Sequence, residues 1–486
     1  MTSTTSTIPH TATAPAKPTD IVDREKPWDE LATAWLSGKP ELLIGLGRRR
    51  AGKSFVLARF AKAVGGVYYQ ATKNTEKKQL TALTKLLGTH FADPALKTGR
   101  AFDEWEELFA YLNDKIGNTP FLLVLDEFPY LAEAAKALPS IIQDQWDHHW
   151  PSSRVRVVLN GSHVTAMVRL ENADQPLYGR RTARLMFPPL YVEHVRDFVP
   201  AYTPIEVITT YGIFGGLPGY LTLLDPQQNL AANVQRLILD PNGRLADDAQ
   251  HVLDAFLSEA DVHYTIIATI AAGERTWNKL TQRSGMSGGS LLRPLRWLEE
   301  MRFVSRRIPI TEGEKSKRVL YTVTDPYISF WHEFVAPLVQ AGQPSVTTPE
   351  LLWRGHVEPA LNTYMGGIFE QVCRDWVART TRLPFQPTAT GSWWDAASDN
   401  ELDIVALGPN DEVMVGECKW GAFDHEDLKK LRDRAALLRA ELPKRFQSAN
   451  IHYVCFSANN TFTDAVRGAA EQGLVTLFTA ADVINA

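Results

Sequence analysis

The sequence predicts an α/β protein whose N-terminal part is a parallel sheet covered by helices. From residue 21 to about residue 200, apolar strand-like runs alternate with segments of helical periodicity, as in β-α-β units. One run, PFLLVLDEF at 120–128, is almost continuously apolar, which is typical of a strand buried inside a parallel sheet. Further strands are expected at 41–47, 65–72 and 154–162, and the segment 204–255 is expected to be helical.

A second pattern begins near residue 263. Three short helical segments at 264–274, 276–285 and 290–301 precede two strand-like segments that are separated by a polar loop. Three helices followed by a hairpin predict a winged helix. A segment rich in Gly, Pro and Thr then leads to a final α/β block. The expected boundaries are a tail at 1–20, an N-terminal core at 21–200, a helical segment at 201–255, a winged helix at 256–340, a linker at 341–355 and a C-terminal domain at 356–486.

Length and composition indicate a folded protein of several domains. Its 486 residues exceed what a single hydrophobic core serves. Hydrophobic residues make up 44% and charged residues 22% of the chain, which is ordinary for globular proteins. The net charge of −5, from 51 basic and 56 acidic residues, argues against a uniformly positive surface. Any contact with nucleic acid is therefore expected to be local.

The sequence favours a cytoplasmic location without a membrane partner. The first twenty residues are rich in Ser, Thr, Ala and Pro, which indicates a disordered tail and not a signal peptide. No apolar run reaches the ~18 residues that span a bilayer. The 3 cysteines form no C-x-x-C pair, so neither a disulfide framework nor a thiolate zinc site is supported.

The segment GRRRAGKS at 47–54 fits the phosphate-loop pattern G-x-x-x-x-G-K-[ST]. In such a loop, backbone N–H groups bind phosphate and the following helix adds a favourable dipole. Lys53 would reach the β- and γ-phosphate oxygens, and the Ser54 hydroxyl would bind Mg²⁺. The pattern also arises by chance, but here it follows an expected strand and opens an expected helix. The predicted nucleotide-binding residues of the loop are Gly47, Arg48, Arg49, Arg50, Ala51, Gly52, Lys53, Ser54 and Phe55.

A second motif supplies the other half of a nucleotide site. Asp126 and Glu127 follow the apolar residues of the strand at 120–128, and α/β sheets bind ligands at the carboxyl ends of their strands. We expect Asp126 to hold Mg²⁺ and Glu127 to polarise the attacking water. The alternative is an acidic strand end that faces solvent. Both motifs together predict ATP hydrolysis.

Polar residues downstream are candidates for contact with the γ-phosphate. Asn160, at the end of the strand 154–162, could sense this phosphate, with Ser162 as the competing choice, or either residue could cap the next helix. Arg180 or Arg181 could neutralise charge that develops on the γ-phosphate. An ordinary surface salt bridge would explain these arginines equally well.

These motifs resemble those of prokaryotic AAA-type P-loop ATPases of the archaeal-ATPase kind, which are related to the STAND signalling ATPases. The similarity extends to IVDRE before the first strand and to LVLDEFPYL, LNGSHVTAM, PLYGRRT and GGLPGYL. The resemblance implies that Arg24, with Asp23 and Glu25, lies beside the adenine. It also implies that 201–255 is a helical lid from which Pro218 contacts the nucleotide. The Lys-Pro-Trp after Glu25 departs from the family's usual acidic residue and leucine.

The expected winged helix has two possible roles. The third helix of this module often enters the DNA major groove, whereas in the ATPases that this chain resembles the module often packs on the ATPase core. Pro294 inside that helix, followed by Glu299 and Glu300, argues against DNA contact. The basic residues of the third helix and of the hairpin loop are Arg293, Arg296, Lys315, Lys317 and Arg318.

The C-terminal block carries charged residues that suit phosphodiester hydrolysis. Residues 400–420 indicate two strands around a GPNDE turn, with Asp403 in the first strand and Glu417 and Lys419 on one face of the second. The pattern resembles the PD-(D/E)xK restriction-endonuclease-like fold, whose usual fourth member is a helical glutamate, here Glu370. Asp403 and Glu417 would hold Mg²⁺ against the scissile phosphate, and Lys419 would stabilise hydroxide or developing charge. Cross-strand salt bridging would also explain Glu-x-Lys.

The sequence therefore predicts an ATP-hydrolysing switch or motor that is joined to a Mg²⁺-dependent nuclease-like domain acting on DNA. ATP and Mg²⁺ are the expected cofactors, and a regulatory protein partner and a homo-oligomer are open possibilities. Two other hypotheses stand beside this one. The chain could be a STAND-like signalling ATPase whose C-terminal block is a catalytically degenerate recognition module, or it could be a DNA-binding regulator.

Overall fold

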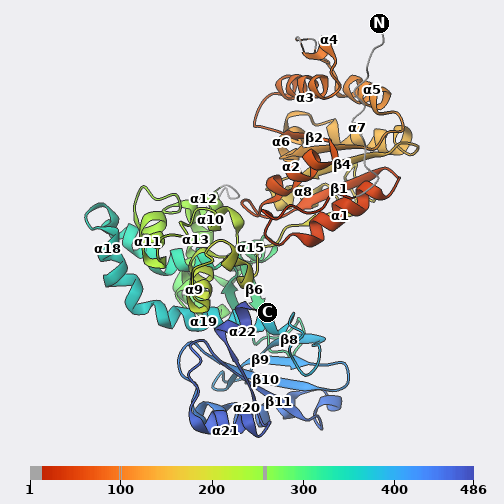
Figure 1. Cartoon of the computed structure of the whole chain (residues 1–486). Helices are drawn as coiled ribbons and strands as arrows, with labels where there is room; N and C mark the ends of the chain where they lie inside the picture. The colour runs from red at the N-terminus through yellow and green to blue at the C-terminus, as the bar shows by residue number, and fades with distance from the viewer. Residues whose placement is uncertain (1–13, 98, 100, 255–259, 486) are drawn as a thin grey trace. The chain divides into compact units, whose positions relative to one another are not determined.

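The structure is a computed structural model that describes residues 14–97, 99, 101–254 and 260–485 (Figure 1). The chain divides into two compact units. The first comprises Met1–Pro189 with Leu217–Gly219, and the second comprises Leu190–Gly216 with Tyr220–Ala486. No helix within the described ranges is both long and apolar enough to cross a membrane.

The first unit contains a five-stranded sheet in which all neighbouring strands are parallel, in the order β2-β3-β4-β1-β5. The predicted parallel sheet is thereby confirmed. Strand β3 is fully buried along its length, as its apolar sequence predicted. The strands are β1 (Glu41–Leu46), β2 (Val67–Gln70), β3 (Phe121–Asp126), β4 (Val155–Asn160) and β5 (Ala183–Met186).

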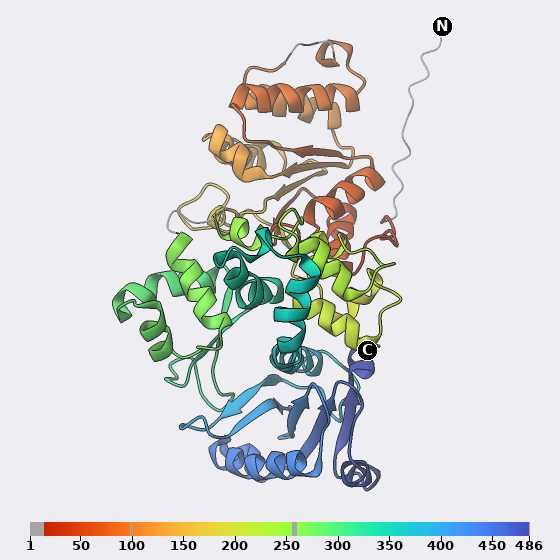
Figure 2. The same ribbon diagram turned by 90° about the vertical axis from the view of Figure 1, so that its left-hand side faces the viewer.

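Helices cover both faces of this sheet (Figures 1 and 2). Alternate strand residues such as Ile44 and Leu123 pack with α3, α5, α6 and α7 in one core, since successive side chains of a strand point to opposite faces. Helices α1 and α2 pack on the other side. The helices of this unit are α1 (Glu25–Leu36), α2 (Lys53–Val64), α3 (Glu76–His90), α4 (Pro94–Lys97), α5 (Trp105–Ile116), α6 (Phe128–Ala134), α7 (Leu138–Asp144), the helical turn η1 (Gln145–His149) and α8 (Val164–Arg169).

The end of the predicted N-terminal tail is ordered. Residues 1–13 lie outside the described residues, but the chain at 14–20 packs beside the start of α1. The Trp28 indole N–H donates a hydrogen bond to the carbonyl oxygen of Pro15 at 2.8 Å, and Lys17 forms an ion pair with Glu25 at 3.1 Å. The Ser/Thr/Pro-rich composition gave no indication of this contact because it depends on where Trp28 lies.

The second unit has a five-stranded mixed sheet at its C-terminal end, in the order β12-β11-β10-β9-β8. Strands β8, β9 and β10 are antiparallel, whereas β10, β11 and β12 are parallel. Helix α20 and strand residues form the core on one face, and α19 contacts β9 and β10. The elements are α19 (Glu358–Val377), β8 (Ala389–Trp394), β9 (Glu401–Leu407), β10 (Val413–Lys419), α20 (His425–Glu441), η7 (Lys444–Phe446), β11 (Ile451–Ser457), α21 (Asp464–Glu471), β12 (Thr476–Thr479) and α22 (Ala480–Ile484).

Helices and a hairpin precede this sheet. Three helices, α13 to α15, come before the antiparallel pair β6 and β7, and α15 continues through Pro294. The elements are η2 (Val192–Asp197), α9 (Pro204–Phe214), α10 (Pro218–Leu221), α11 (Leu230–Val234), η3 (Gln235–Leu239), α12 (Asp248–Asp254), α13 (Ala260–Ala271), α14 (Trp277–Ser284), α15 (Gly288–Glu300), β6 (Val304–Arg307), β7 (Leu320–Val323), α16 (Pro326–Phe330), η4 (Trp331–Val335) and α17 (Ala336–Gln340).

The segment 341–355, where a linker is expected, is largely helical. After η5 (Gln343–Ser345), α18 (Pro349–Leu352) and η6 (Trp353–Val357) lead directly into α19. Thr348 caps α18 by accepting a hydrogen bond from the Leu351 backbone N–H at 3.4 Å, and Pro349 occupies the first turn. A threonine cap followed by proline is a helix-start signal, which the Gly/Pro/Thr composition obscured.

Candidate functional site

The phosphate loop joins β1 to α2 in the first unit. Gly52 has φ +86°, a left-handed conformation that glycine adopts without strain, and it precedes the first residue of α2. Lys53 is buried, and its ammonium group donates hydrogen bonds to the carbonyl oxygens of Gly47 at 2.7 Å and Arg48 at 2.9 Å. The lysine thus lies across the mouth of the loop, where a phosphate oxygen would replace these carbonyl groups as its partner.

Two contacts to the loop come from Pro218 and Gly219, which are distant from it in the sequence; of these, only Pro218 was predicted. The Gly219 backbone N–H donates to the carbonyl oxygen of Arg50 at 3.0 Å, and a Cβ atom on Gly219 would lie only 2.7 Å from the Cβ of Arg50. Glycine is therefore required for this close approach. Pro218 lies beside Gly52, because a Cβ built there would be 3.8 Å from the proline ring. The structure thus brings Pro218 to the loop, as the resemblance implied.

Arg24 also contacts the phosphate loop. Its guanidinium donates to the carbonyl oxygens of Ala51 at 3.1 Å and Pro188 at 2.9 Å, and it pairs with Asp23 at 2.7 Å. Burial lowers the pKa of Arg24, although Asp23 opposes this shift. The arginine binds the backbone of the loop, so its predicted place beside the adenine stays a prediction.

Asp126 lies at the carboxyl end of β3, fully buried among hydrogen-bond donors. One carboxylate oxygen accepts from the Glu127 backbone N–H at 2.9 Å and from the Asn160 side-chain amide. The other accepts from the Tyr68 hydroxyl. Tyr68 also hydrogen bonds with the Ser54 side chain, and its pKa is raised by burial and by Asp126. The Ser54 hydroxyl and the Asp126 carboxylate therefore converge on one point, where Tyr68 now lies.

Glu127 occupies a left-handed turn with φ +51° just before α6. Its carboxylate accepts hydrogen bonds from the Ser162 backbone N–H at 3.1 Å and from the Ser162 hydroxyl at 3.0 Å. Asn160 and Ser162 were predicted as alternative contacts to the γ-phosphate. In the structure, Asn160 donates a hydrogen bond to Asp126, and Ser162 donates to Glu127. Helix α8 begins after His163 without a side-chain cap, so neither residue caps it.

The two candidate arginines lie in ion pairs. Arg180 makes a bidentate pair with Asp147, at 2.9 and 2.6 Å. Arg181 pairs with Glu171. These contacts are the salt bridges that the sequence left open as the alternative to a catalytic role.

Tyr68, whose hydroxyl lies between Ser54 and Asp126, was not among the residues predicted from the sequence. Tyr68 belongs to β2. This strand pairs with β3, and Gln70 of β2 lies opposite Asp126 of β3. The residue could have been found only by assuming that β2 lies next to β3, since the Val-Tyr-Tyr sequence is ordinary for a strand.

The donor set at this site fits Mg²⁺ bound together with nucleotide. Hydroxyl and carboxylate oxygens are ligands that Mg²⁺ prefers, and the ion usually takes only one or two carboxylates from a protein, with phosphate and water completing its shell. Ser54 and Asp126 are such a pair. Consistent with this mode of binding, no group of three or more His, Cys, Asp or Glu residues in the described ranges could hold a metal by itself.

We expect the affinity for ATP to fall above pH 8. Burial lowers the pKa of Lys53 to about 8, against the opposing effects of Glu127 and Asp126. Below that pH the ammonium is charged and attracts phosphate, whereas above it the charge is lost and the dissociation constant should rise about tenfold per pH unit. Titration of a non-hydrolysable ATP analogue from pH 6.5 to 9.5 tests this. Lys53→Met should remove the dependence, and a flat wild-type curve would contradict the expectation.

The C-terminal acids lie on neighbouring strands of the second unit. Asp403 in β9 accepts a hydrogen bond from the Cys418 backbone N–H at 2.8 Å. Glu417 in β10 is buried and pairs with Lys419 at 2.9 Å and with Arg434 at 3.2 Å. Glu417 and Lys419 share a face of β10, as predicted. They also form an ion pair, the structural alternative to a catalytic role that the sequence left open.

Glu370 approaches the same acids from α19. It pairs with Arg374 at 3.9 Å, and Arg374 donates to the backbone carbonyl of Asp403 at 3.0 Å. Burial raises the pKa of Asp403 well above its usual range, and the charges of Glu370 and Glu417 add to this shift. The structure therefore brings together all four predicted residues of this block: Glu370, Asp403, Glu417 and Lys419.

The acid cluster of Glu370, Asp403 and Glu417 has the negative charge that a cation needs, but not all of this charge is free to bind one. Three neighbouring carboxylates form a centre of negative charge, which a divalent cation would relieve. However, Glu417 already has two cationic partners. Among the residues that the structure describes, no group of three or more His, Cys, Asp or Glu side chains could hold a metal ion by itself. A cation would depend on one or two carboxylates and on the phosphate of a substrate.

Two family models match this chain. Residues 21–224 match an ATPase domain predominantly from Archaea, and residues 331–431 match a family described as archaeal and bacterial proteins of unknown function. An uncharacterized protein of Methanocaldococcus jannaschii is 27% identical over 418 residues, which cover 85% of this chain and 90% of that protein.

Solved structures similar to this chain include nucleotide-binding proteins of Archaea. The Walker-type ATPase of Pyrococcus abyssi has a TM-score of 0.46 at 20% identity, over 64% of this chain and 96% of that chain. The ORC2 protein of Aeropyrum pernix, solved as ADPNP-ADP complexes, has a TM-score of 0.41 at 16% identity, over 65% of this chain and 95% of that chain. The match of residues 21–224 to the archaeal ATPase domain identifies the N-terminal part of this chain as an ATPase domain.

Proposed function

We propose that the chain is an ATP-hydrolysing switch whose C-terminal domain is a Mg²⁺-dependent nuclease acting on DNA. The observation that carries the second half is the convergence of Glu370, Asp403, Glu417 and Lys419 at neighbouring positions of α19, β9 and β10. The order of helix, three antiparallel strands, helix and parallel strand supports the restriction-endonuclease-like fold. The helices α13 to α15 and the hairpin β6-β7 would be the winged helix.

At the ATPase site, the chain's own residues would position the phosphates and the water. Lys53 would exchange its two loop carbonyl partners for β- and γ-phosphate oxygens, and backbone N–H groups of residues 47–53 would bind the same phosphates. Ser54 and Asp126 would hold Mg²⁺, which supplies positive charge to the developing phosphate oxygens. Glu127 would orient and deprotonate water, a task for which Ser162 holds its carboxylate in place.

At the C-terminal site, the acids and Lys419 would divide the work. Asp403 and Glu417 would hold a divalent cation, which polarises a phosphoryl oxygen when bound. Lys419 would leave Glu417 and neutralise the charge that develops on the scissile phosphate. Burial and neighbouring acids raise the pKa of Glu370, so this carboxyl group is the candidate proton donor or acceptor of the site.

A DNA-cleavage assay with Mg²⁺ or Mn²⁺ tests the nuclease. We expect Glu417→Gln to lower the cleavage rate at least 100-fold, because it removes the negative charge that holds the cation while keeping the shape of the side chain. Glu471→Gln, an exposed change on α21 of the same domain, is the matched control and should cut like wild type. Equal cleavage by Glu417→Gln and wild type, or no cleavage of DNA or RNA by the wild type, would exclude this function.

One observation favours a second candidate function. Glu417 is held by Lys419 and Arg434, as in a structural salt bridge. If these pairs never open, the block would be a recognition module on a STAND-like signalling ATPase. The same assay separates the two functions, because the signalling protein would leave nucleic acid intact while it still hydrolyses ATP.

A further inference from the structure

The second unit contains a cavity of about 610 Å³ beside the acid cluster. Its walls are the end of α13 with the turn that follows, the hairpin β6-β7, helix α19 and strand β8, and Glu370 lines it. We propose that this cavity binds a single-stranded stretch of nucleic acid through its phosphodiester backbone and delivers it to Glu370 and Asp403. This inference rests on the proposed nuclease and names the substrate form that the site accepts.

Four arginines from three walls line the cavity: Arg306 and Arg307 of β6, Arg374 of α19, and Arg275 of the turn after α13. Arg307 at the end of β6 donates to the Ser392 hydroxyl at 2.6 Å, and Arg374 on α19 donates to the carbonyl oxygen of Asp403 at 3.0 Å. Arg275, in the turn after α13, makes no side-chain hydrogen bond or ion pair with any residue that the structure describes. Its guanidinium lies against α19, because a Cβ on Gly367 would be 3.8 Å from it. Arg275 is thus available for a ligand.

The cavity suits an anion although acids also line it. Glu333, Glu370 and Asp375 face the arginines. Burial raises the pKa of Glu333 to about 7 and also raises the pKa of Asp375. Burial lowers the pKa of Arg307 to about 10, so this guanidinium stays charged at neutral pH. Guanidinium groups bind phosphate with two parallel hydrogen bonds, so a phosphodiester matches the chemistry of these walls.

The size of the cavity selects a single strand. A volume of 610 Å³ corresponds to a cube with an edge of about 8.5 Å. A B-DNA duplex is wider than this, because its major groove alone is about 12 Å wide. The volume also lies within the range of about 300–1,000 Å³ that is usual for sites holding one small molecule. One or two nucleotides of an unpaired strand therefore fit, and a duplex does not.

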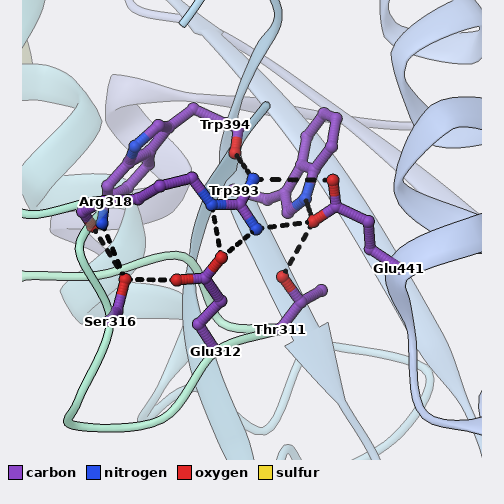
Figure 3. A network of polar contacts seen from close by, with 7 residues as sticks. All are labelled: Thr311, Glu312, Ser316, Arg318, Trp393, Trp394 and Glu441. Atoms are coloured by element: carbon purple, nitrogen blue, oxygen red, sulfur yellow. Dashed lines mark hydrogen bonds and ion pairs between the residues drawn. The ribbon is translucent and has the colours of Figure 1, made fainter. Parts of the chain in front are cut away.

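The hairpin wall is fastened to the C-terminal sheet, which makes the cavity a built feature of this unit. Figure 3 shows Arg318 of the hairpin loop between Glu441 of α20 and the carbonyl oxygen of Trp394, each at 2.8 Å. The Trp393 indole N–H donates to the same Glu441 carboxylate at 2.9 Å. The Ile310 backbone N–H adds a bond to the carbonyl oxygen of Ser392 at 2.9 Å. Arg318, which the sequence offered for DNA contact, is used here for docking.

Binding of a fluorescein-labelled 12-nucleotide DNA strand in EDTA, which prevents cleavage, tests the proposal. We expect Arg275→Gln to weaken binding about tenfold and to lower the slope of log affinity against log salt by about 1, as for a lost phosphate contact. Arg275→Glu should weaken it further. Arg354→Gln, an equal change of charge at a position that is 69% exposed on η6, is the control and should bind like wild type.

The outcomes separate this proposal from the nuclease itself. Affinity of Arg275→Gln equal to that of Arg354→Gln would overturn the cavity as the binding site, even if the wild-type protein cuts DNA. A duplex of the same sequence that binds as tightly and with the same sensitivity to Arg275 would overturn the single-strand assignment. If the wild type binds the strand in a way that depends on Arg275 but does not cleave it, the cavity is supported as the binding site and the nuclease function is excluded. Thermal unfolding of each variant checks that it is folded.

Discussion

Lys53→Ala is expected to lower kcat/KM for ATP hydrolysis at least 100-fold. The hydrogen bonds of the buried ammonium to the carbonyl oxygens of Gly47 and Arg48 place it where phosphate oxygens would lie. Removing a positioned donor to developing phosphate charge costs about 10²–10³ in rate. Release of inorganic phosphate, measured over a range of ATP concentrations, gives the two kinetic constants.

Lys62→Ala is the matched control for Lys53→Ala. Lys62 belongs to the same helix, α2, and is exposed near its end, so this change should leave hydrolysis within twofold of wild type. If Lys53→Ala hydrolyses ATP as fast as Lys62→Ala, the loop 47–54 is not the nucleotide site. A loss of folding is excluded by comparing the thermal unfolding of the two variants.

Glu127→Gln is expected to bind ATP with wild-type affinity and to hydrolyse it 10²–10⁴-fold more slowly, the usual contribution of a general base. Glutamine keeps the shape of the side chain, and its carbonyl oxygen can still accept the hydrogen bonds from Ser162. The phosphate-binding geometry is therefore preserved while the basic carboxylate is lost. Binding of labelled ATP and release of phosphate, measured on the same preparation, separate the two effects.

Glu133→Gln controls for this change, because Glu133 lies on α6 with its side chain exposed. It should bind and hydrolyse ATP like wild type. A Glu127→Gln protein that turns over at the wild-type rate would exclude Glu127 as the base. Loss of ATP binding together with hydrolysis would instead assign Glu127 to binding.

The parts of the ATPase site that the sequence predicted are those whose geometry is local. The loop 47–54 joins a strand to a helix, so its conformation follows from its own glycines and from the start of α2. Asp126 and Glu127 lie together because an apolar strand ends there. The match of residues 21–224 to an archaeal ATPase domain confirms the ATPase that these motifs predicted.

The features that sequence reasoning missed depend on how distant segments meet. Tyr68 approaches Asp126 only because β2 is the neighbour of β3. The binding of Ser162 to Glu127 needs a particular turn after β4. The helix that starts at Thr348-Pro349 was not predicted, because the Gly/Pro/Thr composition of the segment does not show it. The cavity lined by arginines of α19, of β6 and of the turn after α13 joins elements that are far apart in the sequence, which no local pattern indicates.

In the C-terminal domain, one contact of Glu417 was predictable from the sequence and another was not. The alternation of β10 placed Glu417 and Lys419 on one face, and their ion pair follows from that alternation. The additional pairing of Glu417 with Arg434 depends on α20 packing over β10 and was not visible in the sequence. This second partner is the reason that a cleavage assay is needed.

The central claim is that ATP at the loop 47–54 controls a nuclease at Glu417. The most direct measurement is the rate of DNA cleavage by the wild type and by Lys53→Ala, each with and without ATP. The rate of ATP hydrolysis by Glu417→Gln is measured beside it. The account predicts that ATP changes cleavage by the wild type but not by Lys53→Ala, and that Glu417→Gln hydrolyses ATP without cutting. Cleavage by the wild type that is the same with and without ATP, or absent in both, would contradict it.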